Sequence, residues 1–68
     1  MGQVRLGVVS RIDLEEEHGI IMDENCQDIF FSLKEFQDRL ELNAKVSFEI
    51  EFGDYGLMAV NIRPANNN

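Results

Sequence analysis

The sequence predicts a single all-β domain of five short strands, with one short helix between the third and fourth strands. Three observations lead to this prediction. Apolar and polar residues alternate along most of the chain, turn-forming clusters separate the alternating stretches, and one stretch changes to helical spacing. The 68 residues, 44% of them hydrophobic, suffice for one small core. We expect residues 1–64 to form the domain and residues 65–68 to be a disordered tail.

The amino-terminal half is expected to contain three strands. Apolar residues alternate with others over residues 4–12, until an acidic cluster begins at residues 13–17. A short apolar strand over residues 18–22 ends at the turn-forming residues 23–25. The third strand is predicted over residues 28–31.

Helical spacing replaces the alternation after the third strand. Ser32-Leu33-Lys34-Glu35 fits a capping box, in which the Ser side chain caps a backbone N–H and the Glu side chain reaches back. Leu33, Phe36 and Leu40 follow at helical spacing, and Asn43 is a plausible stop. We therefore predict a short helix over residues 33–41.

The carboxy-terminal part shows the clearest alternation, with one apolar and one polar face. The alternating residues of the fourth strand are Val46, Phe48, Ile50 and Phe52 against Ser47, Glu49 and Glu51. Residues 53–56 supply a turn, and the fifth strand, 57–63, is expected to place Met58, Val60 and Ile62 on one side. Five strands with a short helix after the third form the layout of the OB-fold, so we predict a five-stranded antiparallel OB-type β-barrel.

The amino-acid composition limits the functions that the chain is expected to have. Six basic residues face thirteen acidic ones, and the net charge of -7 argues against simple phosphate binding. The single cysteine excludes an intramolecular disulfide, and no signal peptide or membrane span is visible, so we expect a cytoplasmic protein without a membrane partner.

The sequence carries no recognisable catalytic or metal-binding motif. The chain has no nucleophile elbow, Gly-rich phosphate loop, HExxH or paired-Cys motif. His18 and Cys26 lack the further paired ligands of a zinc site. We expect a protein that is not an enzyme and needs no cofactor or metal.

Two blocks of residues carry a family resemblance. The carboxy-terminal block is Val46-Ser47-Phe48-Glu49-Ile50 with Gly53, Gly56, Ala59 and Asn61, and the amino-terminal block is Gly7, Val9, Gly19, Ile21, Asp28 and Phe30. In this register the chain resembles the cold-shock domain from Gly7 to Arg63, with a segment between Phe36 and Leu40 that is shorter than in typical bacterial members. The resemblance implies an OB-type barrel that binds single-stranded nucleic acid.

The motifs that bind nucleic acid in this family are altered here. The family's Lys-Gly-Phe-Gly-Phe-Ile reads Glu-Glu-His-Gly-Ile-Ile at residues 16–21, and Val-Phe-Val-His-Phe reads Ile-Phe-Phe-Ser-Leu at residues 29–33. The family's Lys-Trp-Phe becomes Ser10-Arg11-Ile12. Phe30 alone keeps an aromatic ring at a stacking position. Arg11 is able to stack its guanidinium on a base and to contact phosphate.

Two functional hypotheses follow. In the first, the chain binds single-stranded RNA or DNA weakly and with salt sensitivity. The residues expected to make this site are Arg11, His18, Ile20, Phe30, Ser32 and Tyr55. In the second, the barrel is a protein-interaction module, whose apolar patch of Ile20, Phe30 and Leu33 within an acidic surround suits a basic partner. A second copy of the chain is an alternative partner. The acidic run at residues 13–17 is a solvated loop, an imitation of phosphate charge or a contact for a basic partner.

Overall fold

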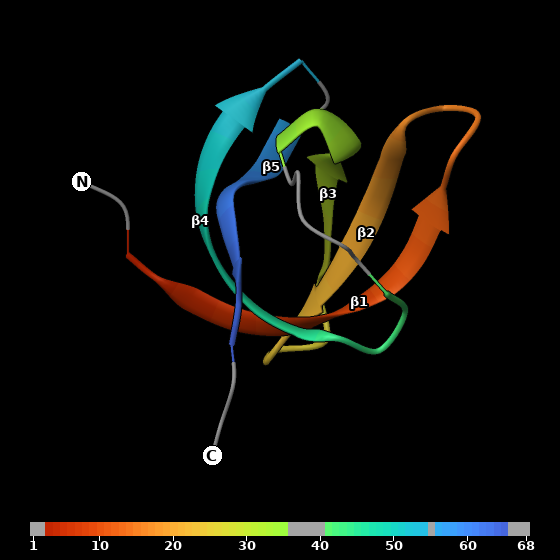
Figure 1. Ribbon diagram of the computed structural model, residues 1–68. Coiled ribbons are helices and arrows are strands. Elements are labelled where there is room, and N and C mark those ends of the chain that lie inside the picture. Colours follow the sequence, from red (N-terminus) through yellow and green to blue (C-terminus); the bar gives the residue numbers. More distant parts are fainter. Residues whose placement is uncertain (1–2, 36–40, 55, 66–68) are drawn as a thin grey trace.

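A closed five-stranded barrel accounts for the strands that the sequence predicts (Figure 1). The computed structural model describes residues 3–35, 41–54 and 56–65. The strands are β1 (Arg5–Asp13), β2 (His18–Asp23), β3 (Asp28–Ser32), β4 (Lys45–Gly53) and β5 (Gly56–Pro64). Their order around the barrel is β1-β2-β3-β5-β4, and β4 returns to β1 to close it. The predicted all-β barrel of the OB type is confirmed.

One seam of the barrel is parallel rather than antiparallel. β3 and β5 meet in parallel at Phe30 and Met58, whereas the other four strand pairs are antiparallel. The reason is geometric, because a ring with an odd number of strands cannot alternate direction at every seam. The seam therefore places Met58 of β5 beside Phe30 of β3, although no hairpin connects these two strands.

Two one-residue bulges change which side chains face the interior. Val9 pairs with Ile21 but Arg11 pairs with Ile20, so Ser10 is an extra residue in β1. Glu49 pairs with Val60 and Ser47 with Arg63, so β5 has an extra residue around Asn61, whose φ is 53°. A bulge of this kind bends the strand and interrupts the alternation of faces.

The bulge in β5 corrects one sequence prediction. Met58, Val60 and Ile62 do not share a side, because Ile62 is buried together with Ala59, while Met58 and Val60 remain half-buried. Inward side chains therefore occur on both sides of the bulge at a spacing of three residues rather than two. The same shift in β1 lets both Val9 and Ile12 pack toward the core.

The core is made of inward side chains from all five strands. Its buried members are Val9, Ile21, Ile29, Phe31, Val46, Phe48, Ala59 and Ile62. Phe52 shares the face of Ile50, as the alternation predicts, but it is 83% exposed and does not join the core. β1 pairs with β4 only as far as Phe48, so the end of β4 extends beyond the closed part of the barrel.

A single 3-10 turn, η1 (Leu33–Glu35), stands at the start of the predicted helix. The Ser32 hydroxyl accepts a hydrogen bond from the Lys34 backbone N–H at 3.2 Å, so Ser32 caps this turn as expected. Residues 36–40 of the predicted helix lie outside the described residues, and Glu41 is not helical. The η1 turn contacts β2 and β5 and lies over one end of the barrel (Figure 1).

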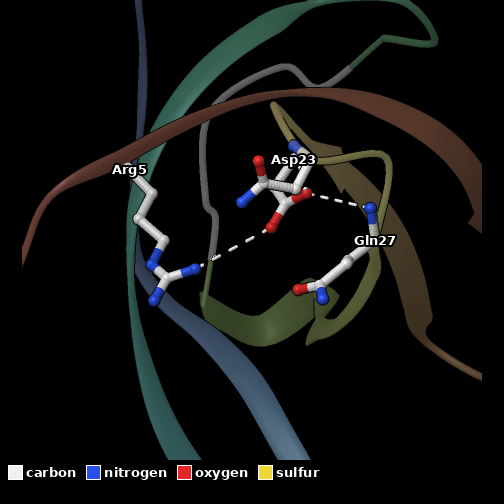
Figure 2. Close-up of polar contacts among 4 residues, drawn as sticks. Arg5, Asp23 and Gln27 are labelled. Atoms are coloured by element: carbon white, nitrogen blue, oxygen red, sulfur yellow. Dashed lines mark hydrogen bonds and ion pairs between the residues drawn. The ribbon is translucent and has the colours of Figure 1, made fainter.

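A buried carboxylate organises the β2–β3 turn at the opposite end (Figure 2). One oxygen of Asp23 accepts hydrogen bonds from the backbone N–H groups of Asn25 and Gln27, both at 2.9 Å. The other oxygen lies 3.8 Å from the Arg5 guanidinium and has no hydrogen-bond partner among the described residues. The Asp23 side chain is 3% exposed and the Arg5 side chain 42%.

At the carboxyl end, the Ala65 backbone N–H donates to the Lys45 carbonyl at 2.9 Å, so ordered pairing continues one residue beyond Pro64. Residues 66–68 of the predicted tail lie outside the described residues.

Within the described ranges, no helix is long and apolar enough to cross a membrane.

The turn predicts a difference between two substitutions. Asp23→Ala removes two hydrogen bonds to backbone amides, and we expect it to lower the free energy of unfolding by about 2–3 kcal/mol. Arg5→Ala removes a half-exposed guanidinium that lies 3.8 Å from the buried carboxylate without a hydrogen bond to it, and it should cost less, about 1 kcal/mol. Urea unfolding followed by circular dichroism measures both. Equal losses would show that the ion pair, rather than the capped turn, stabilises this end.

Candidate nucleic-acid interface

A row of outward side chains runs around the barrel through four strand pairs. Its members, each paired with the next across a seam, are Arg11, Ile20, Phe30, Met58 and Glu51. Residues paired directly across neighbouring strands project to the same face. Phe30 is 37% exposed, whereas its neighbours Ile29 and Phe31 are buried, which identifies this face as the outer one.

His18 and Phe30 form an aromatic pair on this face. Their ring centroids are 5.5 Å apart and the ring planes are tilted by 30°. His18 begins β2 and pairs with Ser32, while Phe30 lies two residues earlier on β3. The rings border an open hollow of about 360 Å³, lined by Glu16, Glu17, His18, Phe30, Ser32 and Met58. The site thus offers a partly apolar platform of two tilted rings.

The charges around this platform are unevenly distributed. Glu16 and Glu17 line the hollow beside His18, and Glu51 ends the row on β4. Arg11 ends the row on β1. Lys34 approaches Glu17 at 3.9 Å, but both side chains are highly exposed, so this pair offsets little of the negative charge. An anionic ligand is therefore favoured near Arg11 on β1, and disfavoured at the hollow and at the end of β1, where Asp13 pairs with His18.

Glu17 carries backbone strain. Its φ is 61°, a left-handed conformation that favours glycine, and the cold-shock pattern has Gly at this position. Its carbonyl accepts a hydrogen bond from the Leu33 N–H at 3.0 Å, which ties the β1–β2 turn to η1. At this position the chain thus has a residue that strains the turn and adds a negative charge.

Four of the six residues predicted from the sequence lie together at the platform, namely His18, Ile20, Phe30 and Ser32. Arg11 is placed beside Ile20, at the edge of the platform. The Ser32 hydroxyl already accepts a hydrogen bond from Lys34. Tyr55 lies outside the described residues.

The structure adds one residue to the site and removes another from the alternative apolar patch. Met58 is paired with Phe30 and lines the hollow, but β5 is distant in sequence from the two binding motifs and gave no signal. The parallel pairing of β3 with β5, by which an OB barrel closes, is the feature from which the position of Met58 could have been predicted. Leu33 packs against the core, so the patch of Ile20, Phe30 and Leu33 does not form as predicted.

Metal binding has no geometric support in the part of the chain that the structure describes. His18 begins β2, whereas Cys26 is exposed in the turn that follows the end of β2. No group of three His, Cys, Asp or Glu side chains in the described ranges is arranged to hold an ion.

Comparisons with known proteins agree with this architecture. No sequence model of a known protein family matches the chain, and no curated protein matches it. Among solved structures, Drosophila Unr CSD456 superposes with a TM-score of 0.80 and 20% sequence identity, over 98% of this chain. The chain spans 29% of the length of that structure's chain. On this evidence, the protein has the five-stranded barrel fold of the Unr cold-shock domains.

Proposed function

We propose that this barrel binds single-stranded RNA or DNA with low affinity, through the outer face that carries His18 and Phe30. The observation that supports it most directly is the pair of rings 5.5 Å apart beside an open hollow. Base–aromatic stacking is the main sequence-tolerant contribution to single-strand binding on OB barrels. Ile20 and Met58 extend the platform with apolar contact on either side of Phe30.

The platform sets the expected strength of binding. Stacking of one base on an aromatic ring contributes about 1–3 kcal/mol. A site with one Phe and one His therefore supports one or two stacked bases, fewer than the full set of aromatic residues in the cold-shock pattern. Low affinity and weak sequence preference follow from this limited platform.

Charge suggests the path of the phosphates. Arg11 lies at one end of the row, and Lys45 of β4 lies across from Val8, nearer the start of β1. Glu16 and Glu17 at the hollow would repel phosphate. A strand whose base stacks on Phe30 is therefore best placed with its phosphates over the outer face of β1, and its binding should weaken as salt rises.

The role proposed is binding and not catalysis, because barrels of this kind are typical of binding domains. With this role we keep the sequence-based proposals of a cytoplasmic location and of one domain over residues 1–64.

A basic protein is the second candidate partner for the same face. The apolar centre of the row, Ile20, Phe30 and Met58, is flanked by the carboxylates of Glu16 and Glu51. Such a patch with an acidic border suits a partner with Lys or Arg around an apolar anchor. Failure of nucleic-acid binding combined with loss of protein capture in Phe30→Asp would favour this candidate.

The first prediction for binding compares two exposed phenylalanines. Amide shifts are followed by NMR during titration with oligo-dT and oligo-U, at low and then at physiological salt. Phe30→Ala should weaken binding by roughly 5- to 150-fold, the equivalent of one lost stacking contact. Phe52→Ala, a matched loss of an exposed Phe on β4, should leave the affinity unchanged. Flat shifts at low salt, or equal losses in the two variants, would contradict the proposed function.

A second prediction concerns the strained acidic turn. Glu17→Gly should raise the free energy of unfolding by about 0.5–1 kcal/mol, because glycine adopts the left-handed conformation without strain. The same change removes a negative charge from the hollow and should strengthen binding of oligo-dT. Glu15→Gly is the control, since it removes a charge from the same loop at a residue without positive φ. If Glu15→Gly is equally stabilising, backbone strain at Glu17 is not the cause.

A further inference from the structure

In the part of the chain that the structure describes, the outer edge of β4 is unpaired along its second half. β1 pairs with β4 over Lys45–Phe48 only. From Glu49 to Gly53, β4 pairs with β5 alone among the described residues, and this part of β4 extends away from β1 (Figure 1). Unpaired N–H and C=O groups on such an edge are able to accept a further extended chain as an added strand.

The two faces of this edge differ in chemistry. Glu51 projects to the outer face with its partner Met58, and alternation places Glu49 on that face as well. Glu49 accepts a 3.3 Å hydrogen bond from the Asn61 side chain. On the opposite face, Ile50 packs against the core and Phe52 is 83% exposed. Phe52 pairs with Leu57, which is 42% exposed, so two exposed apolar side chains lie together next to the unpaired edge and indicate a surface for contact.

The negative charge around this edge of β4 determines which kind of partner it favours. From Val46 to Ile62 the sequence contains no Lys, Arg or His, whereas Glu49, Glu51 and Asp54 are acidic. Phosphate is disfavoured here, and positive side chains are favoured. A second copy of the chain is also disfavoured, because antiparallel pairing of two β4 edges would set glutamates directly opposite glutamates.

We propose that the Glu49–Gly53 edge binds an extended basic segment of another protein by strand addition. The segment would run for about five residues, the length of the open edge. Its side chains would alternate, with Lys or Arg facing Glu49 and Glu51 and an apolar residue facing Phe52. This surface shares Glu51 with the outward row but contains neither His18 nor Phe30, so its occupation does not require nucleic-acid binding.

A defined peptide tests the proposal. The probe is fluorescein-labelled Lys-Val-Lys-Val-Lys-Val-Lys, and its anisotropy is followed on addition of the full chain at low salt. The comparison probe, Lys-Val-Lys-Pro-Lys-Val-Lys, has the same charge, but its central proline removes a backbone donor and disfavours the added strand. Amide shifts of the ¹⁵N-labelled chain locate the contact. We expect the first peptide to bind more tightly and its shifts to concentrate on Glu49–Gly53.

Two pairs of variants separate strand addition from general charge attraction. Glu51→Lys and Phe52→Thr should each weaken binding about tenfold, because they remove a facing charge and a facing apolar surface while keeping a strand-compatible residue. Glu24→Lys makes the same charge change in the β2–β3 turn, and Leu14→Thr removes an exposed apolar side chain from the β1–β2 turn. These controls should change the affinity less than about twofold.

Several results would overturn the proposal: equal binding of both peptides, equal losses in Glu51→Lys and Glu24→Lys, shifts outside β4, or no binding at low salt. None of them bears on the Phe30 titration, so the two proposals fail independently.

Discussion

Closure of an odd-numbered ring of strands is the constraint on which this structure depends. Five strands cannot all alternate in direction, so β3 and β5 meet in parallel at Phe30 and Met58. Closure also requires strong local bending, and the bulges at Ser10 and Asn61 provide it. Gly19 lets β1 and β2 approach closely, since a Cβ there would stand 2.6 Å from the Arg11 carbonyl oxygen. These few features determine which side chains face the core and which face outward.

The candidate site is a consequence of that closure. Phe31 faces inward and is fully buried, so Phe30 faces outward, where the parallel seam adds Met58 beside it. The bulge at Ser10 brings Arg11 opposite Ile20, at the cationic end of the same row. The scaffold is thus that of a cold-shock barrel, while the surface chemistry differs: a pair of rings replaces a broad aromatic platform, and glutamates border the hollow. The inferred low affinity follows from these replacements and not from the fold.

Local patterns predicted most of the fold and part of the site. Alternation placed all five strands and the outward direction of Phe30, because faces alternate reliably along a regular strand. It failed at Ile62, where a bulge overrides the period, and it did not predict that Phe52, on the face of Ile50, would be exposed beyond the closed part of the barrel. Neither feature has a local signature here. Met58 was missed because its place beside Phe30 arises from a pairing between distant segments. The capping role of Ser32 was predicted correctly, since it depends on adjacent residues only.

The account rests on the outward row that joins Phe30 to its neighbours on β2 and β5. The most direct test is a nuclear Overhauser spectrum of the free protein with ¹³C-labelled methionine methyl groups and aromatic rings. The account predicts cross-peaks from the Phe30 ring to the Met58 methyl group and to the His18 ring. Cross-peaks from Met58 to the core ring of Phe48 instead would mean that β5 faces the other way. The site described around Phe30 would then be wrong.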